Sequence, residues 1–401
     1  MSLALFVLAF APGEPVAPRE GVLQIQAAEI WTAGGERIQD GLLRIEDGRV
    51  RSVSTGKQSD PALPLVRHPG VVTAGLIGLR SQAGVGGELQ EDTRSVLAEA
   101  RAVHAFDPAH PDVARALAAG ITALELAPAP GNVVGGLACV VKTSGGRVLT
   151  SEASLALSLT SAALGRSTGP SFFVFGAAEV PGEAQAQPDG GPEWSERTPR
   201  GNREPTSYAG ALALLRRSFA EGQGPFARAK RGDLAVTIEA WDRHEVLRAV
   251  ELARELGLAG AVRGAPLAGD PAVVQALKES KLGVIVGPYS AGQTRASLES
   301  VKTLAAAGVP VAFALGDPAR SPEALRLSAA RALRAGAPPA AVWKALTEDA
   351  AKLAGVGASL GTLAAGREAD FVLWSGDPLD LQSRVVAVYV DGQRAWPAPG
   401  H

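Results

Sequence analysis

The stretch of sequence that decides the fold lies near the C-terminal end, where the chain reads FVLW at residues 371–374 and VVAVYV at residues 385–390. Asp391-Gly392 follows the second run directly. An Asp-Gly pair beside an apolar strand is typical of a type I′ hairpin turn, because both central residues of that turn need a positive φ. We therefore expect the end of the chain to form a small antiparallel sheet.

The beginning of the chain repeats this arrangement. Strand-like runs occur at residues 22–26, 29–31, 41–45 and 50–53, and Asp47-Gly48 separates the last two. Two β-rich ends around a different middle predict that both ends meet in one discontinuous β-sandwich, built from residues 21–73 and 356–398.

The middle of the chain, residues 74–355, alternates apolar runs with helical patterns. We expect strands at residues 76–79, 121–126, 171–175, 234–239, 258–262, 282–286 and 309–315. We expect helices at residues 111–119, 207–221, 244–256, 271–278, 298–307, 322–335 and 339–346. Such alternation is typical of βα units, so the sequence predicts an α/β fold with a parallel sheet or barrel. A polar stretch at residues 177–206 is expected to be a long loop.

Composition excludes several classes of function. The chain has 401 residues, 46% of them hydrophobic, which is enough for a sizeable core. It has 39 Lys and Arg residues and 41 Asp and Glu residues, so there is no excess of positive charge to bind nucleic acid. A single cysteine, Cys139, excludes an internal disulfide and a cysteine-rich zinc site.

The N-terminal residues 1–20 allow two interpretations. An apolar run at residues 3–11 is too short to span a membrane but suits the hydrophobic part of a signal peptide, with Ala9-Phe10-Ala11 as a cleavage site. A signal peptide would place the protein outside the cytoplasm, in the periplasm. A disordered tail or an apolar strand is the alternative and leaves the protein in the cytoplasm. No other stretch reaches the length of a membrane span.

Two motifs carry a resemblance to a known family. The chain reads VVTAGLI at residues 71–77, which is similar to a V-x-P-G-L-I-D motif, and GREADFVLW at residues 366–374, ahead of Asp391-Gly392. Both resemble the amidohydrolase superfamily, in particular its imidazolonepropionase-like members. The resemblance implies a TIM-like (β/α)8 barrel flanked by a β-sandwich from both chain ends. It also implies a hydrolase of C–N bonds other than peptide bonds that uses zinc, iron or another divalent metal.

The metal-ligand positions of that family are degenerate in this chain. Its paired histidines, spaced HxH, fall on Arg80 and Gln82, with Ser81 between them. Arginine stays protonated and cannot ligate a cation. At the ends of two later strands, where the family places histidine or a modified lysine, this chain has Glu239 and Arg263. Of these two residues, only Glu239 could act as a metal ligand.

Asp317 corresponds to the family's aspartate on the last barrel strand, which binds metal and handles the proton of the attacking water. The alternative is a structural role, because Gly316-Asp317-Pro318 is good turn chemistry and a helix follows. A charge at the end of a barrel strand needs a partner, so Arg80 is expected at the same barrel mouth as Gln82 and Asp317, paired with Asp317.

Other polar residues have structural interpretations. Gly135-Gly136 is expected to form a tight turn after strand 121–126, and Lys142 a solvated strand end. Surface or helix-capping roles are expected for the five histidines, which are His68, His104, His110, His244 and His401.

Three functional hypotheses follow. In the first, the protein has lost the metal centre, needs no cofactor, and acts as a pseudoenzyme with a binding or scaffold role and a small-molecule ligand at the barrel mouth. In the second, it is an active hydrolase of non-peptide C–N bonds with an atypical site using Asp317 and perhaps also Glu239. In the third, it is a secreted binding protein that uses the loop at 177–206. The substrate and the oligomeric state stay open.

Overall fold

The computed structural model describes residues 21–56, 59–87, 89, 91, 93–165, 203–264, 269–316 and 321–398. Several expectations lie outside these residues: the N-terminal segment 1–20, the strand at 171–175, most of the loop at 177–206, His401 and Asp317. None of the helices in the described part of the chain is both long enough and apolar enough to cross a membrane.

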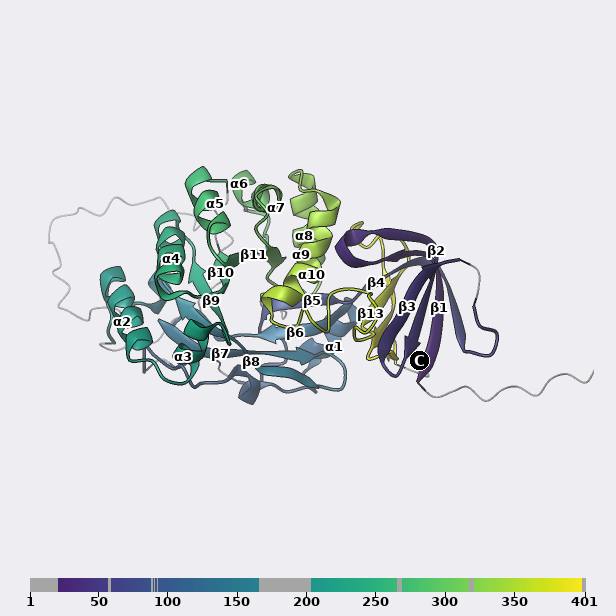
Figure 1. Cartoon of the computed structure of the whole chain (residues 1–401), viewed down its shortest axis with the longest axis horizontal. Coiled ribbons are helices and arrows are strands. Elements are labelled where there is room, and N and C mark those ends of the chain that lie inside the picture. Colours follow the sequence, from purple (N-terminus) through teal and green to yellow (C-terminus); the bar gives the residue numbers. More distant parts are fainter. Residues whose placement is uncertain are drawn as a thin grey trace, which may run out of the picture.

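One seven-stranded sheet joins the two ends of the chain, as expected, in the order β15-β14-β13-β4-β1-β2-β3 (Figure 1). Strand β4 pairs with β13 in antiparallel fashion, with Thr73 opposite Val372. The strands are β1 (Val22–Trp31), β2 (Arg37–Glu46), β3 (Arg49–Thr55), β4 (Leu65–Ala74), β13 (Phe371–Trp374), β14 (Val385–Val390) and β15 (Gln393–Trp396).

The two Asp-Gly turns of this sheet have the expected backbone. Asp47 and Gly48 have φ values of 49° and 74°, and Asp391 and Gly392 have values of 50° and 74°. A positive φ at both central residues is the requirement of a type I′ turn. Both hairpins are therefore confirmed, and each orients an aspartate at the end of the sheet.

The middle of the chain forms an eight-stranded barrel sheet in the order β12-β11-β10-β9-β8-β7-β6-β5. The strands are β5 (Leu76–Ser81), β6 (Ile121–Leu126), β7 (Val134–Lys142), β8 (Val148–Ser158), β9 (Ala235–Ala240), β10 (Gly260–Gly264), β11 (Leu282–Val286) and β12 (Val311–Phe313). A parallel bridge between Leu79 and Ala314 brings the last strand back to the first, so the sheet nearly closes.

The barrel is not parallel throughout, which corrects one expectation. Strand β7 runs antiparallel to both β6 and β8. The connections at residues 127–133 and 143–147 are too short for the crossover that a parallel neighbour needs. Gly135 and Gly136 lie within β7 and form no tight turn: a Cβ on Gly136 would lie 2.5 Å from the carbonyl oxygen of Ala100, so only glycine fits there.

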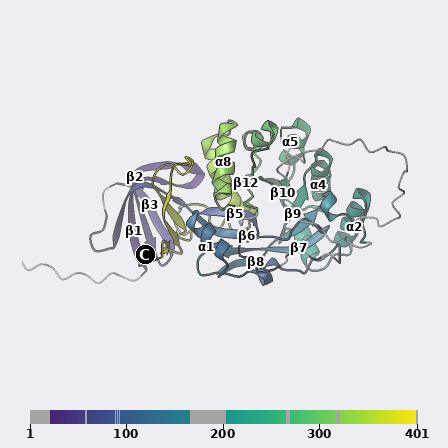
Figure 2. The same ribbon diagram turned by 180° about the vertical axis from the view of Figure 1, so that it is seen from behind.

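Most described helices lie along one side of the barrel, beside β9 to β12, while β6 to β8 run along the other side (Figures 1 and 2). Proline occupies the first turn of α1, α3, α5 and α9. The helices are α1 (Pro111–Ala118), α2 (Tyr208–Ala220), α3 (Pro225–Arg231), α4 (Arg243–Leu256), α5 (Pro271–Lys278), α6 (Arg295–Leu298), α7 (Ser300–Ala306), α8 (Ala324–Arg334), α9 (Pro339–Leu346) and α10 (Glu348–Leu353).

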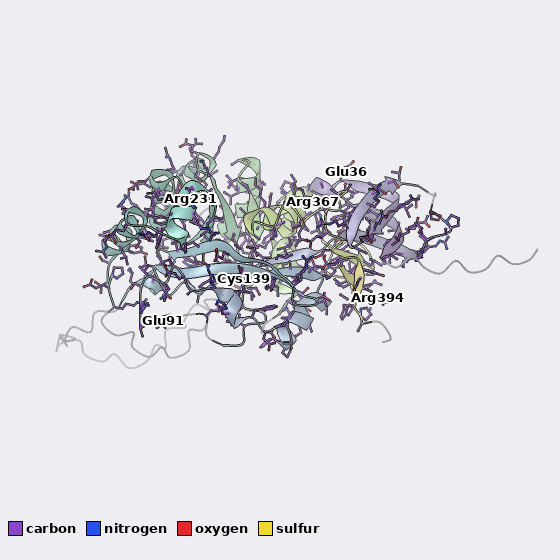
Figure 3. The ribbon with its side chains drawn as sticks, turned by 60° about the horizontal axis from the view of Figure 1, so that its bottom comes forward. Glu36, Glu91, Cys139, Arg231, Arg367 and Arg394 are labelled. Atoms are coloured by element: carbon purple, nitrogen blue, oxygen red, sulfur yellow. The ribbon has the colours of Figure 1, made fainter. Side chains whose placement is uncertain are left out.

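Two side chains with titratable groups are buried away from the barrel mouth, and a third caps a helix. Cys139, on β7 in the middle of the molecule (Figure 3), is fully buried. His68 is buried as well, contrary to the expected surface or capping role, and its Nε2 donates to the Trp374 carbonyl oxygen at 2.8 Å. His110 does cap a helix, because its ring accepts from the Asp112 N–H at the start of α1.

Candidate functional site

Arg80 is the central residue of the candidate site at the barrel mouth. It lies near the end of β5 with a positive φ of 53°, and its side chain is only 5% exposed. Its Nη2 contacts Glu239 Oε1 at 2.6 Å and donates to the Pro128 carbonyl oxygen at 2.9 Å. Non-glycine residues with positive φ are uncommon and cluster at functional sites. Both the backbone and the charge therefore mark Arg80 as unusual.

Glu239 links two arginines. It lies on β9, is 1% exposed, and stands opposite Arg263 of β10 in the strand register. Arg263 Nη1 contacts Glu239 Oε2 at 2.8 Å, so each oxygen of this carboxylate accepts from a different guanidinium group. Ser158 of β8 stands opposite Glu239 on its other side. The ends of β5, β9 and β10 thus build a largely buried Arg80–Glu239–Arg263 cluster.

A second buried carboxyl, Glu125 on β6, lies beside this cluster. Its Oε2 accepts from the backbone N–H of Arg80 at 3.0 Å, and its Oε1 accepts from the Ser154 hydroxyl at 3.4 Å. Burial raises the pKa of Glu125, and the nearby charge of Arg80 opposes that rise only in part. The sequence did contain a signal for this residue, because a single acidic side chain stands inside an otherwise apolar strand.

The residues expected at the site have different outcomes in the structure. Arg80 has a buried carboxylate partner, as expected, but that partner is Glu239. Gln82 is exposed, and its backbone N–H donates to the Gly316 carbonyl oxygen at 3.4 Å. Asp317 lies outside the described residues, so its proposed pairing with Arg80 and its catalytic role stay predictions.

A separate charged cluster joins the barrel to the sheet of the chain ends. Lys142, at the end of β7, is fully buried, so the expectation of a solvated strand end was wrong. Its Nζ contacts Asp370 at 2.6 Å, Glu368 at 2.8 Å and Asp391 at 3.3 Å. Arg147 contacts Glu368 at 2.7 Å and Asp391 at 2.8 Å. We call these five residues the Lys142 cluster.

Charge pairing explains the pKa directions in this cluster. Burial would raise the pKa of Glu368, but the hydrogen bonds and charges of Lys142 and Arg147 outweigh burial and lower it. Burial raises the pKa of Asp370, against the opposing effect of Lys142. The three carboxylates lie close enough together to hold a cation, yet Lys142 and Arg147 already supply positive charge there.

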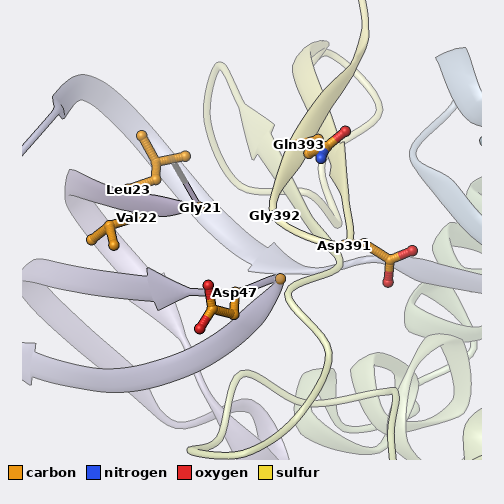
Figure 4. Close-up of a pocket in the computed structure, with 8 residues that line it drawn as sticks. Gly21, Val22, Leu23, Asp47, Asp391, Gly392 and Gln393 are labelled. Carbon is orange, nitrogen blue, oxygen red and sulfur yellow. The ribbon is translucent and has the colours of Figure 1, made fainter. Parts of the chain in front are cut away.

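A pocket of about 360 Å³ lies beside this cluster, between the two Asp-Gly turns (Figure 4). Asp47 and Asp391 both line it, with Gly21 at its edge. The side chain of Asp391 points away from Asp47 in this view, which agrees with its contacts to Lys142 and Arg147. The polar lining of this pocket belongs to turns of the sheet rather than to barrel strand ends.

Comparison with known proteins places the fold. A model described as the amidohydrolase family matches residues 248–395. The structure of an amidohydrolase from Thermotoga maritima MSB8 is similar over 93% of this chain and 99% of that chain, with a TM-score of 0.76 and 22% identity. The C-terminal part of the chain thus matches the amidohydrolase family, and the whole fold is similar to that of a solved amidohydrolase. The imidazolonepropionase-like subgroup and the domain boundaries near residues 74 and 355 stay predictions.

Two further matches are weaker or shorter. The A. niger ochratoxinase structure covers 93% of this chain and 95% of that chain, with a TM-score of 0.56 and 17% identity. Amidohydrolase tasK of Hapsidospora irregularis is 30% identical over 92 residues, which span 23% of this chain and 9% of that relative. These likenesses support the fold.

The described residues of the barrel mouth are a poor match for the divalent metal that the resemblance to amidohydrolases implies. Metal centres of hydrolytic enzymes use neutral imidazoles and carboxylates that are free to coordinate. Of the two ligand candidates that the sequence offered, Glu239 is the one among the described residues, and guanidinium groups contact both of its oxygens. Glu125 accepts from the Arg80 N–H and the Ser154 hydroxyl. The other group at a helix start, Asp242, His244 and Glu245, includes the capping box of α4.

Proposed function

We propose that this protein is a pseudoenzyme of the amidohydrolase superfamily, in which the buried Arg80–Glu239–Arg263 cluster replaces the metal centre. In this proposal the barrel mouth binds a ligand and performs no metal-dependent hydrolysis of a C–N bond. The observation that carries it is the pair of contacts on Glu239, at 2.6 Å from Arg80 and 2.8 Å from Arg263.

Electrostatics support this proposal. A divalent cation at 4 Å from one guanidinium group would be repelled by roughly 8 kcal/mol at an effective dielectric constant of 20. Two such groups contact Glu239, so a metal on this carboxylate would lie close to both positive charges. Breaking a buried ion pair costs about 3–5 kcal/mol for each partner removed. Metal binding at Glu239 would therefore oppose the stability of the fold.

The metal content of the purified protein tests the proposal. The chain is expressed in medium supplemented with zinc, iron and manganese, purified without chelator, and analysed by inductively coupled plasma mass spectrometry. We expect less than about 0.1 metal ion per chain, because the arginine side chains occupy the ligand positions. Stoichiometric metal would overturn the proposal and favour the second hypothesis, an active hydrolase of non-peptide C–N bonds using Asp317.

A variant extends this test. Replacing Arg80 and Gln82 together with histidine restores the HxH spacing of the family but leaves Arg263 against Glu239. We expect the double variant to remain without hydrolytic activity toward amide and lactam substrates in the presence of added zinc. Activity of the variant would mean that the remaining ligands are present, against the proposal.

A further inference from the structure

The Lys142 cluster holds an amine and a carboxyl group in contact, away from water. The Lys142 side chain is fully buried, and the Asp370 side chain is 3% exposed. Lys142 Nζ lies 2.6 Å from Asp370 Oδ2. Because a carboxyl C–O bond is about 1.2 Å long, the same nitrogen lies within about 3.8 Å of the Asp370 carboxyl carbon. An amine at this distance is close to the position from which it attacks a carbonyl carbon.

The groups around this pair match the needs of an amide-forming reaction. The Asp391 backbone N–H donates to Asp370 Oδ1 at 3.0 Å, where it stabilises the negative charge that this oxygen acquires when an amine attacks. Glu368 Oε2 lies 2.8 Å from Lys142 Nζ, within reach of its protons. Arg147 contacts Glu368 at 2.7 Å and favours its ionised form, which accepts protons. Burial raises the pKa of Asp370, which favours the neutral carboxyl group that an amine attacks.

We propose that Lys142 and Asp370 form an isopeptide bond, a covalent amide between the two side chains. Glu368 takes one proton from the Lys142 ammonium group, and the neutral amine attacks the Asp370 carboxyl carbon. The bond from that carbon to Oδ2 then breaks, and the hydroxyl leaves as water with the proton that Glu368 returns. The nitrogen passes a second proton to Glu368, which releases it to solvent. One water molecule and one proton leave, and no oxidant or reductant takes part.

Burial favours the product over the ion pair. The reaction replaces a fully buried ammonium group with a neutral amide, which removes the cost of a charge held away from water. Two groups held in contact also react as if one were present at about 10⁵–10⁸ M. The side chain of Asp391 is 41% exposed, so the released water has a short way to solvent. At a separation of 2.6 Å the two side chains are not bonded, so the ion-paired chain is the reactant.

The bond would join the barrel to the sheet of the chain ends. Lys142 ends β7 and Asp370 directly precedes β13, 228 positions later in the chain. A cross-linked chain resists unfolding more than the ion-paired chain, because its unfolded state is constrained, so stabilities are compared between chains of unmodified mass. The inference concerns this cluster alone and does not depend on the proposed function of the barrel mouth.

Mass spectrometry of the denatured chain tests this inference. The full chain is analysed directly after purification and again after one week, folded, at pH 7 and 37 °C. We expect at least about half of the chains to have lost the mass of one water molecule by the end of the week. Trypsin should then release peptide 116–147, uncleaved after Lys142, joined to peptide 368–384, and fragmentation should locate the bond on Asp370.

Three variants and a control test the chemistry. Asp370→Asn keeps the carbonyl carbon and should lose ammonia in place of water, which an ion pair cannot do. Glu368→Gln removes the proton acceptor and should slow bond formation at least tenfold. Lys142→Arg keeps a positive charge but no amine, so its full mass should remain. The control Lys278→Arg changes an exposed lysine on α5 and should alter the extent of bond formation by less than twofold.

Other outcomes overturn the inference. Full mass in nearly all wild-type chains after the week would contradict it, and a bond located on Glu368 or Asp391 would overturn the choice of Asp370. Asp-Gly pairs also lose water when they form a cyclic imide, but that loss persists in Lys142→Arg and leaves no joined peptides. Loss of water without joined peptides therefore counts against the isopeptide bond.

Discussion

Replacing Lys142 with methionine removes the only fully buried cation of the Lys142 cluster and keeps nearly the same side-chain length. Its Nζ contacts Asp370, Glu368 and Asp391 at 2.6, 2.8 and 3.3 Å. Removing one partner of a buried ion pair costs about 3–5 kcal/mol. Because Lys142 has three partners, we expect a loss of about 4–5 kcal/mol in the free energy of unfolding, limited by the contacts that Arg147 retains.

Equilibrium urea unfolding, followed by circular dichroism, measures this loss. Lys278→Met is the matched control, since Lys278 is exposed on α5, and it should change the free energy of unfolding by less than about 0.5 kcal/mol. A loss below about 1 kcal/mol for Lys142→Met would refute the reasoning, because the buried carboxylates would then tolerate the absence of their cation.

The dependence of this loss on pH gives an independent check. Without Lys142, the carboxyl groups of Asp370 and Glu368 face each other with less positive charge, so their pKa values in the folded state rise above those in the unfolded state. The folded variant then binds more protons than the unfolded chain, and its stability increases as the pH falls. We expect the deficit relative to the wild type to shrink from pH 7 to pH 5, and a constant deficit would argue against charge as its cause.

Three further predictions concern buried groups. Arg80→Ala should lower the free energy of unfolding by about 3 kcal/mol, since Glu239 keeps Arg263; a loss near zero, equal to that of Arg216→Ala at an exposed ion pair, would show a solvated arginine. Burial raises the pKa of the Cys139 thiol to about 12, so a thiol reagent at pH 8 should label the folded chain negligibly and modify one thiol per chain in urea. Burial lowers the pKa of His68, so the folded chain binds fewer protons than the unfolded chain, and the free energy of unfolding should fall as the pH drops below about 6.5. In urea unfolding curves recorded between pH 7 and pH 5, His68→Gln should reduce this dependence of stability on pH.

Much of the fold could be predicted from local sequence patterns, because these elements depend on residues that are close together in the sequence. The apolar runs at 121–126 and 282–286 coincide with β6 and β11, and the helices expected at 271–278 and 339–346 coincide with α5 and α9. Proline in the first turn fixes the starts of these two helices. The Asp-Gly turns likewise depend only on their own backbone.

Strand β7 was not predicted, because the contacts that make it a strand are with segments distant in the sequence. Gly135-Gly136 has the composition of a turn, yet Gly136 is glycine because the carbonyl of Ala100 approaches it. No sequence pattern indicates that these two segments lie in contact. Lys142 was misjudged for the same reason, since its partners Asp370 and Asp391 follow more than 200 residues later.

The candidate site was predicted in part. The motif likeness located Arg80 at a barrel strand end and required a carboxylate for it. That Glu239 reaches Arg80 depends on the stagger of the barrel strands, and the register that places Glu239 opposite Arg263 becomes visible only in three dimensions.

The pairing of β4 with β13 has a consequence for the time course of protein synthesis. The edge of β4 that receives β13 is made roughly 300 residues before its partner. At 5–20 residues per second, a ribosome needs about 15–60 s to cover that distance. During this interval an apolar strand edge lies open on the nascent chain, and open edges of this kind pair with other chains. A chaperone, or strands of the unfinished barrel, that covers this edge during translation must leave before β13 to β15 can complete the sheet.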